Sequence, residues 1–287
     1  MINLASIKYK NILSEHGGPI DRLTYSQVNL SHNLKGYEAT ALLKADLRHN
    51  ADKYTLYDNV DGMGSDTYKS IACYKAISEA LERWAYYISS ITQPNIYGFD
   101  IDNSTNGMAA FPDLLKITAR RNSLYEALER WTLCEWWANN LAVTLHTIND
   151  INCMEIKIPP YGVTCISWKI SNEKYVYGFA SAKNFLTAFN KSTIELFRND
   201  YVLSKSNFFN NNLNLQEQRL IFFSTKNGYN IFLEKVKESS AKQQQNKTPK
   251  LILSKEIIGP WSKYSTIWRS LFETTNQNNE SVEVFLF

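Results

Sequence analysis

The hexapeptide Glu-Ala-Leu-Glu-Arg-Trp occurs twice in this sequence, at residues 79–84 and 126–131. A six-residue identity of this kind arises by chance in roughly one chain of this length in several hundred. On an α-helix, residues three and four positions apart share a face, so Glu79, Glu82 and Arg83 project together. Each copy therefore presents two carboxylates and one guanidinium as a unit.

Two interpretations of this repeat are open. One is a solvated helix surface, on which each Glu–Arg pair contributes about 0.2–0.5 kcal/mol. The other places the two helices across one cleft, where the facing carboxylates would repel one another unless cations lay between them. Mg²⁺ prefers such oxygen ligands, and arginines in the same cleft suit a triphosphate. This second interpretation predicts a phosphoryl-transfer site, with Mg²⁺ held by Glu79, Glu82, Glu126 and Glu129 and phosphates held by Arg83 and Arg130.

Helical periodicity predicts the elements that carry these residues. A first helix is expected from an N-cap at Ser65 or Asp66 to about Ser89, with an apolar stripe at helical spacing. The second helix is expected from about Pro112 or Asp113 to Leu141. A third, at 184–203, contains Glu195 and Arg198.

The segments between the helices favour strands and turns. Residues 104–110 are typical of a turn, and residues 162–170 and 174–182 predict a hairpin. We therefore expect an α+β protein, with repeated strand–helix modules packed on a mixed β-sheet. The expected organisation is a core at 1–204 and a smaller C-terminal portion at 205–287 with polar, mobile insertions, or else one continuous domain.

Bulk composition excludes several classes of function. Lys and Arg number 31 against 28 Asp and Glu, so nothing favours general binding to nucleic acid or to an anionic membrane. The four histidines are widely separated, which argues against a zinc site, and the common P-loop and dinucleotide motifs are absent. Without a signal peptide or an 18-residue apolar run, the chain is expected to be soluble and cytoplasmic.

In its ordered motifs the sequence resembles the YcaO family of ATP-dependent peptide-modifying enzymes. The family's two helical E-x-x-E-R motifs are matched by "AISEALERWAYY" and "SLYEALERW". A "GKG" turn before the first motif is matched by "GMG" at 62–64, and an "S-x-N-G-x-A" loop before the second is matched by "STNGMAA" at 104–110. A later segment ending in E-x-x-R is matched by "GFASAKNFLTAFNKSTIELFR" at 178–198.

This resemblance implies Mg²⁺- and ATP-dependent modification of a ribosomally synthesised precursor peptide, by cyclodehydration or a related amide activation that forms products such as azolines. It assigns Mg²⁺ to the four motif glutamates. It assigns ATP to Arg83, Ser104, Asn106, Arg130, Glu195 and Arg198, and it identifies no further catalytic residue. The implied partners are the precursor peptide, a leader-peptide-binding or ThiF-like protein, a flavin-dependent dehydrogenase and further copies of this chain.

The sequence also departs from the family pattern. Met63 replaces the turn lysine, and Lys75 replaces a serine four residues before the first motif. Polar residues usual upstream of the second motif are missing from 110–122, and the C-terminus lacks a proline-rich tail. These departures motivate an alternative: a degenerate YcaO-like subunit that binds peptide or a catalytic partner without ATP turnover. Asp61 and Asp66 are expected to be turn or capping residues rather than metal ligands.

Overall fold

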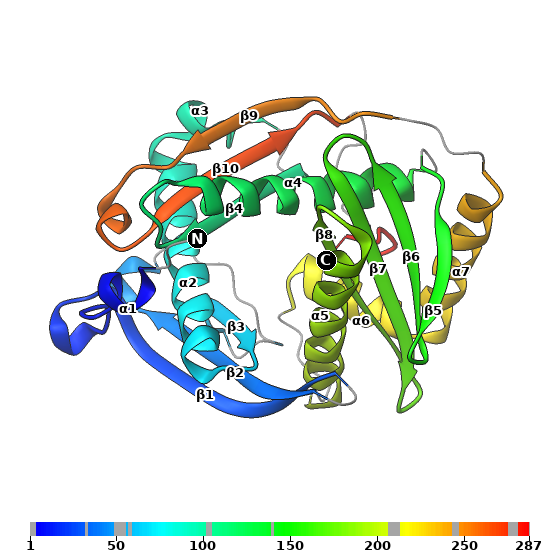
Figure 1. Cartoon of the computed structure of the whole chain (residues 1–287), viewed down its shortest axis with the longest axis horizontal. Coiled ribbons are helices and arrows are strands. Elements are labelled where there is room, and N and C mark those ends of the chain that lie inside the picture. The colour runs from blue at the N-terminus through cyan, green and yellow to red at the C-terminus, as the bar shows by residue number, and fades with distance from the viewer. Residues whose placement is uncertain are drawn as a thin grey trace. The chain divides into compact units, whose positions relative to one another are not determined.

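The computed structural model describes residues 4–31, 34–48, 56, 59–101, 105–138, 141–205, 213–242, 247–274 and 281–286 (Figure 1). The chain divides into two compact units that are interleaved in sequence. Unit 1 comprises Met1–Asp52, Asn59–Leu124 and Leu251–Leu271, and unit 2 comprises Lys53–Asp58, Tyr125–Lys250 and Phe272–Phe287. Residues 205–287, expected to be a separate portion, thus contribute to both units.

Unit 1 contains two three-stranded sheets. The first has the order β1-β2-β3, and its strands are β1 (Ile20–Ser31), β2 (Leu34–Leu43) and β3 (Gly62–Asp66). The second has the order β4-β10-β9, and its strands are β4 (Asn106–Phe111), β10 (Thr266–Phe272) and β9 (Leu251–Glu256). The short helical segments of this unit are α1 (Ala5–Lys8), η1 (Ser14–His16), η2 (Ala45–Leu47), α3 (Pro94–Tyr97) and η5 (Pro260–Lys263).

The long helix α2 (Lys69–Thr92) packs on the first sheet and carries the first hexapeptide. Its buried face is rich in alanine, including Ala76 and Ala80, and these small side chains let the helix backbone approach the sheet closely. A Cβ atom on Gly62 of β3 would lie only 2.1 Å from the carbonyl oxygen of Ala76. At the other end of the buried face, Trp84 packs edge-on against Trp261. This close packing fixes the rotation of α2 relative to β3.

Unit 2 is built on a four-stranded antiparallel sheet with the order β5-β6-β7-β8. Helix α5 (Phe185–Lys205) packs on β7 and β8, and α4 (Ile117–Trp137) brings the second hexapeptide into this unit. The remaining elements are β5 (Thr144–Ile148), β6 (Ile151–Ile158), β7 (Gly162–Ser171), β8 (Lys174–Ala182), α6 (Leu215–Ser224) and α7 (Lys226–Ser240).

An aromatic cluster fills the core of unit 2 and holds its C-terminal segment. The buried ring of Phe285 lies between 5.0 and 5.7 Å, centroid to centroid, from the rings of Trp136, Tyr177, Phe223 and Phe232. The buried guanidinium of Arg219 donates to the carbonyl oxygens of Ser281 and Leu286. Residues 281–286 are therefore anchored by both apolar packing and hydrogen bonds.

The α+β class, the hairpin and the third helix are confirmed, but two expectations about strands are wrong. Three antiparallel sheets replace the single mixed sheet. Residues 106–110, expected within a turn, belong to strand β4 (Asn106–Phe111), because this segment pairs with β10 far along the chain. The hairpin joins β7 to β8 through Asn172 and Glu173, whose φ angles of 47° and 63° match a tight two-residue turn.

The expected helix starts were also wrong. Ser65 and Asp66 belong to β3, and Tyr68 occupies the N-cap of α2 without a side-chain hydrogen bond. Helix α4 begins at Ile117, several residues after Asp113, yet Asp113 Oδ2 still accepts a hydrogen bond of 2.8 Å from the Thr118 N–H. A carboxylate can thus stabilise a helix start from just outside the helix.

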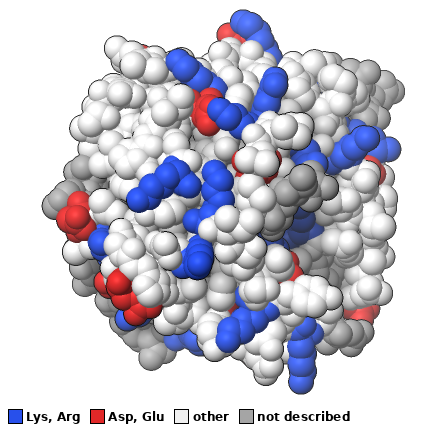
Figure 2. Space-filling model, turned by 60° about the vertical axis from the view of Figure 1, so that its left-hand side comes forward, with Lys and Arg blue, Asp and Glu red and all other residues white. Residues whose placement is uncertain are grey.

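Charge and hydropathy give two further observations. In the part of the chain that the structure describes, no helix is long and apolar enough to cross a membrane. On the face shown in Figure 2, many of the Lys and Arg side chains are separated by uncharged surface. Over the whole sequence the formal net charge is +3.

Candidate functional site

In the first hexapeptide, Glu79 is held from two sides. Its Oε2 accepts a 3.0 Å hydrogen bond from the backbone N–H of Met63, on the end strand β3. Its Oε1 lies 3.3 Å from Nη2 of Arg83, one helical turn further along α2. Both side chains are about one-third exposed or less, so water screens this ion pair only in part. The two contacts orient the carboxylate of Glu79 beside the free edge of the sheet.

The second hexapeptide repeats the ion pair within unit 2. Oε1 of Glu126 lies 3.6 Å from Nε of Arg130, with the same four-residue spacing as Glu79 and Arg83. Glu129, between them in sequence, accepts a 3.0 Å hydrogen bond from the backbone N–H of Ser181 on β8. The prediction that each hexapeptide forms one charged unit on its helix is supported by these equivalent pairs.

A third carboxylate joins this cluster from α5. Oε2 of Glu195 accepts a 3.1 Å hydrogen bond from the backbone N–H of Phe179. Phe179 and Ser181 are two residues apart on β8, the end strand of its sheet, so both amides point to the free edge. Two helices therefore supply carboxylates to one strand edge.

Two carboxylates of this cluster, those of Glu129 and Glu195, have raised pKa values. Burial raises the pKa of Glu195 to about 7, and the charge of Glu126 adds to this, against the opposing effects of Arg198, the Phe179 N–H and Arg130. Burial likewise raises the pKa of Glu129 well above its ordinary value, with the charges of Glu195 and Glu126 contributing. Because burial disfavours the charged form of both carboxylates in spite of the nearby arginines, an added cation would be favourable here.

The remaining candidate residues belong to unit 1. Glu82 is partly buried on α2. Asn106 lies at the start of β4, where its Oδ1 accepts a 2.7 Å hydrogen bond from Nε of the fully buried Arg269. Ser104 lies outside the described residues. The expected juxtaposition of the two hexapeptide helices involves residues of both units and stays a prediction.

The donor types fit Mg²⁺ and ATP. Carboxylate oxygens are the ligands that Mg²⁺ prefers, and Arg130 and Arg198 are suited to phosphate oxygens. Within the described residues, no group of three or more His, Cys, Asp or Glu side chains is arranged to hold a metal ion. Protein-bound Mg²⁺ commonly uses only one or two carboxylates, with water and substrate phosphates completing its coordination. An Mg²⁺ ion that binds together with ATP therefore does not need three or more ligands from the protein.

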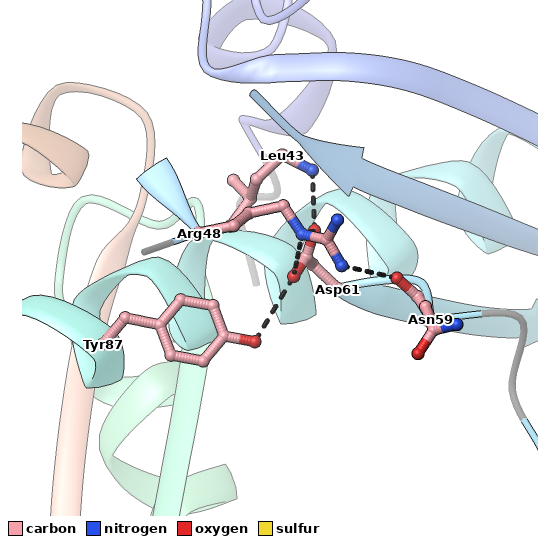
Figure 3. Close-up of polar contacts among 5 residues, drawn as sticks. All are labelled: Leu43, Arg48, Asn59, Asp61 and Tyr87. Carbon is pink, nitrogen blue, oxygen red and sulfur yellow. Dashed lines mark hydrogen bonds and ion pairs between the residues drawn. The ribbon is translucent and has the colours of Figure 1, made fainter. Parts of the chain in front are cut away.

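A second polar cluster in unit 1 has a structural role (Figure 3). The carboxylate of Asp61 is buried and accepts hydrogen bonds from the Leu43 N–H, the Tyr87 hydroxyl and Nε of Arg48. Arg48 also donates to the carbonyl oxygen of Asn59 at 2.6 Å. With these partners Asp61 links β2, the segment before β3 and α2, which are tertiary contacts rather than those of a turn or a helix cap.

Lys75 and Asp66 form a separate pair at the other end of β3. Nζ of Lys75 lies 2.7 Å from Oδ2 of Asp66 and donates to the carbonyl oxygen of Ser65. The Lys75 side chain is half exposed and is paired with Asp66 rather than free. It secures the end of β3 to α2.

Sequence reasoning missed the strand amides. The residue types of Met63, Phe179 and Ser181 do not indicate that their backbone N–H groups donate to glutamates. A signal for two of them is present, since Gly62-Met63 precedes Glu79 and Gly178-Phe179 precedes Glu195 at the same 16-residue spacing. The signal is weak because backbone donors place no demand on residue type.

Comparison with known proteins adds evidence about the fold. No protein-family model matches the sequence, and no curated protein matches it. Two solved structures match over 87% of this chain and 86% of theirs, at 14% identity. They are the E. coli microcin synthetase McbBCD complex, with a TM-score of 0.53, and the same complex with pro-MccB17 bound, with a TM-score of 0.51. The likeness supports the YcaO-like fold expected from the sequence.

Proposed function

We propose that this chain is a YcaO-like enzyme that uses Mg²⁺ and ATP to modify the backbone of a ribosomally synthesised precursor peptide. The observation that carries the proposal is the unit 2 cluster, in which burial raises the pKa of Glu129 and of Glu195, and the charge of Glu126 adds to both shifts, beside Arg130 and Arg198. Such a cluster is expected where a cation and a polyanion bind together. The fold likeness to a synthetase complex, one structure of which has pro-MccB17 bound, supports a peptide substrate.

Each candidate residue has a proposed role. Glu79, Glu82, Glu126 and Glu129 would hold Mg²⁺, and Arg83, Arg130 and Arg198 would bind phosphate oxygens. Ser104, Asn106 and Glu195 would complete the nucleotide site. Bound ATP would supply a phosphoryl group that turns the oxygen of an attacked amide into a good leaving group, which dehydration of an amide requires. The strand amides of Met63, Phe179 and Ser181 would orient the carboxylates before ligand binds.

The proposed partners follow from this role. A precursor peptide rich in Cys, Ser or Thr would supply the nucleophile and the amide. A leader-peptide-binding or ThiF-like protein and a flavin-dependent dehydrogenase would act with this chain. The likeness to a multi-subunit synthetase supports partner proteins in general terms.

Calorimetric titration with ATP tests the nucleotide site. We expect binding in the presence of Mg²⁺, and a loss of affinity of at least tenfold in Arg130→Met, because a charged hydrogen-bond donor to phosphate contributes about 1.5–3 kcal/mol. Arg120→Met is the matched control, since Arg120 lies exposed over Trp268 in unit 1. Absence of binding by the wild type at millimolar Mg²⁺-ATP would reject the proposal.

A second candidate function is a binding subunit without ATP turnover. It is favoured by one observation: Lys75 is engaged with Asp66 and Ser65, while Met63 replaces a lysine at the preceding turn. Both positions therefore lack a free cation for phosphate. Such a subunit would bind a precursor peptide with the same affinity with and without Mg²⁺-ATP and would release no phosphate in its presence.

A further inference from the structure

Strand β1 (Ile20–Ser31) is a long end strand with an exposed outer edge (Figure 1). Within the described part of the chain, β2 is the only strand that pairs with it. Most residues from Asp21 to Asn29 are exposed, and Tyr25 is 51% exposed with Nζ of Lys69 over its ring. The outer edge of β1 therefore presents a row of backbone donors and acceptors.

Two other end strands, β3 and β8, differ from β1 because side chains contact their free edges. The free edge of β3 has its Met63 N–H bonded to Glu79, and the free edge of β8 has two N–H groups bonded to Glu195 and Glu129. A carboxylate placed on an edge amide blocks the approach of another strand. Helices thus close those edges, and no comparable side-chain contact to a backbone group of β1 is present among the described residues.

The middle of β1 also lacks the features that protect an edge strand. Charged residues, proline and β-bulges usually prevent edge-to-edge pairing. The eight residues Leu23–Leu30, of sequence LTYSQVNL, include no charge, proline or glycine. The irregularities in pairing with β2 fall at the two ends, between Ile20 and Arg22 and between Asn29 and Ser31. Between them β1 is a regular strand that another strand can extend.

We propose that β1 pairs in antiparallel fashion with β1 of a second copy of this chain, joining two three-stranded sheets into one with the order β3-β2-β1-β1-β2-β3. The two-fold axis of such a pair is perpendicular to the sheet, so the same face of β1 stays on the same side in both copies. The two-fold axis can then pass between the two copies of Tyr25 or between the two copies of Ser26, which gives two possible registers. In either register Asp21 and Arg22 face uncharged residues of the other strand, drawn from 28–31.

This absence of like-charge contacts makes the edge of β1 compatible with β1 of a second copy. Like charges placed directly opposite across a strand pair are destabilising, and β1 avoids them against itself in both registers. The proposal is independent of ATP and peptide binding, so its failure would leave the proposed function unaffected.

The test is the mass of the full-length protein in solution, measured by light scattering during gel filtration at tens of micromolar. We expect twice the 33.1 kDa of one chain for the wild type and one chain for Ser26→Lys. The two lysines would lie directly opposite each other in the register centred on Ser26 and diagonally across the strand pair in the register centred on Tyr25. Ser26 lies opposite Glu38 on β2, so a lysine is acceptable within the chain itself. Ser26→Thr, which adds no charge, is the matched control and should remain a dimer.

A second control locates the interface. Thr144→Lys places the same charge on the exposed end strand β5 of unit 2 and should leave the dimer intact. Hydrogen exchange of the wild type should show alternate amides of Leu23–Leu30 protected at high protein concentration and exchanging on dilution. A monomeric wild type, which would leave the edge to an extended peptide, or a Ser26→Lys variant as dimeric as the wild type, would overturn the proposal.

Discussion

The backbone N–H of Phe179 donates a 3.1 Å hydrogen bond to Glu195, sixteen residues further along the chain. Met63 and Glu79 repeat this relationship in unit 1, with the same spacing and a length of 3.0 Å. In each case an end strand is followed by a helix whose carboxylate accepts from the strand's free edge. One carboxylate oxygen of each glutamate thereby fixes the position of the side chain, and the second oxygen is left for other contacts.

The glycine before each strand donor makes this arrangement possible. A Cβ on Gly178 would lie 2.1 Å from the carbonyl oxygen of Ser192, as a Cβ on Gly62 would from that of Ala76. We expect Gly178→Ala and Gly62→Ala each to lower the free energy of unfolding by about 3 kcal/mol or more, since rigid backbone must move. Urea unfolding measures this, with Thr144→Ala on the exposed strand β5 as control. A cost below that of the control would show that the helices are not held at this distance.

The buried carboxylate of Asp61 should be a major contributor to the stability of unit 1. Asp61→Ala leaves the Leu43 N–H, the Tyr87 hydroxyl and Arg48 without their acceptor, and we expect a loss of about 3–5 kcal/mol. Asp61→Asn retains one acceptor oxygen and should lose less. Equal stability of the alanine variant and the wild type in chemical unfolding would contradict the role shown in Figure 3.

The Asp66–Lys75 pair predicts a small effect of pH. Burial alone would raise the pKa of Asp66, but hydrogen bonds from Lys75 and the Tyr68 N–H, with the charge of Lys75, outweigh it and lower the pKa below 3.8. The stabilisation is therefore complete above the unfolded pKa and is lost as pH falls through the folded pKa. Because Lys75 is half exposed, we expect at most about 1 kcal/mol.

Lys75→Met checks this pH effect. In urea unfolding between pH 6 and pH 3, the variant should lose less stability than the wild type, because its Asp66 no longer gains from the lysine. Lys183→Met, which removes an exposed lysine from unit 2, is the control. The same pH dependence in wild type and Lys75→Met would show that the ion pair contributes nothing.

The parts of this structure that could be predicted from sequence are those determined by local pattern. The α2 and α5 helices and the β7–β8 hairpin follow from apolar periodicity and a short polar turn. Strands β3 and β4 could not be predicted, because Gly-rich segments resemble turns and become strands here by pairing with β2 and β10. The start of α4 was misplaced because Asp113 bonds to the first turn from outside the helix.

The candidate site likewise has residues that local sequence pattern predicts and a grouping of residues that it does not. Repetition identified Glu79, Glu126 and their arginines, since a four-residue helical spacing alone brings them together. The grouping of Glu129 with Glu195 depends on β8 presenting two amides to two different helices, and no local sequence pattern encodes that.

The most direct test of the central proposal is the melting temperature of the wild type and of Glu82→Gln, each with and without Mg²⁺-ATP. Ligand at a hundred times its dissociation constant stabilises by about 2.7 kcal/mol, so we expect a rise of roughly 5 °C for the wild type. The rise should be much smaller for Glu82→Gln and unchanged for Glu234→Gln, which alters an exposed carboxylate on α7. If ligand shifts neither the wild type nor Glu82→Gln, and Glu82→Gln is itself the more stable protein, the carboxylates do not serve a nucleotide site.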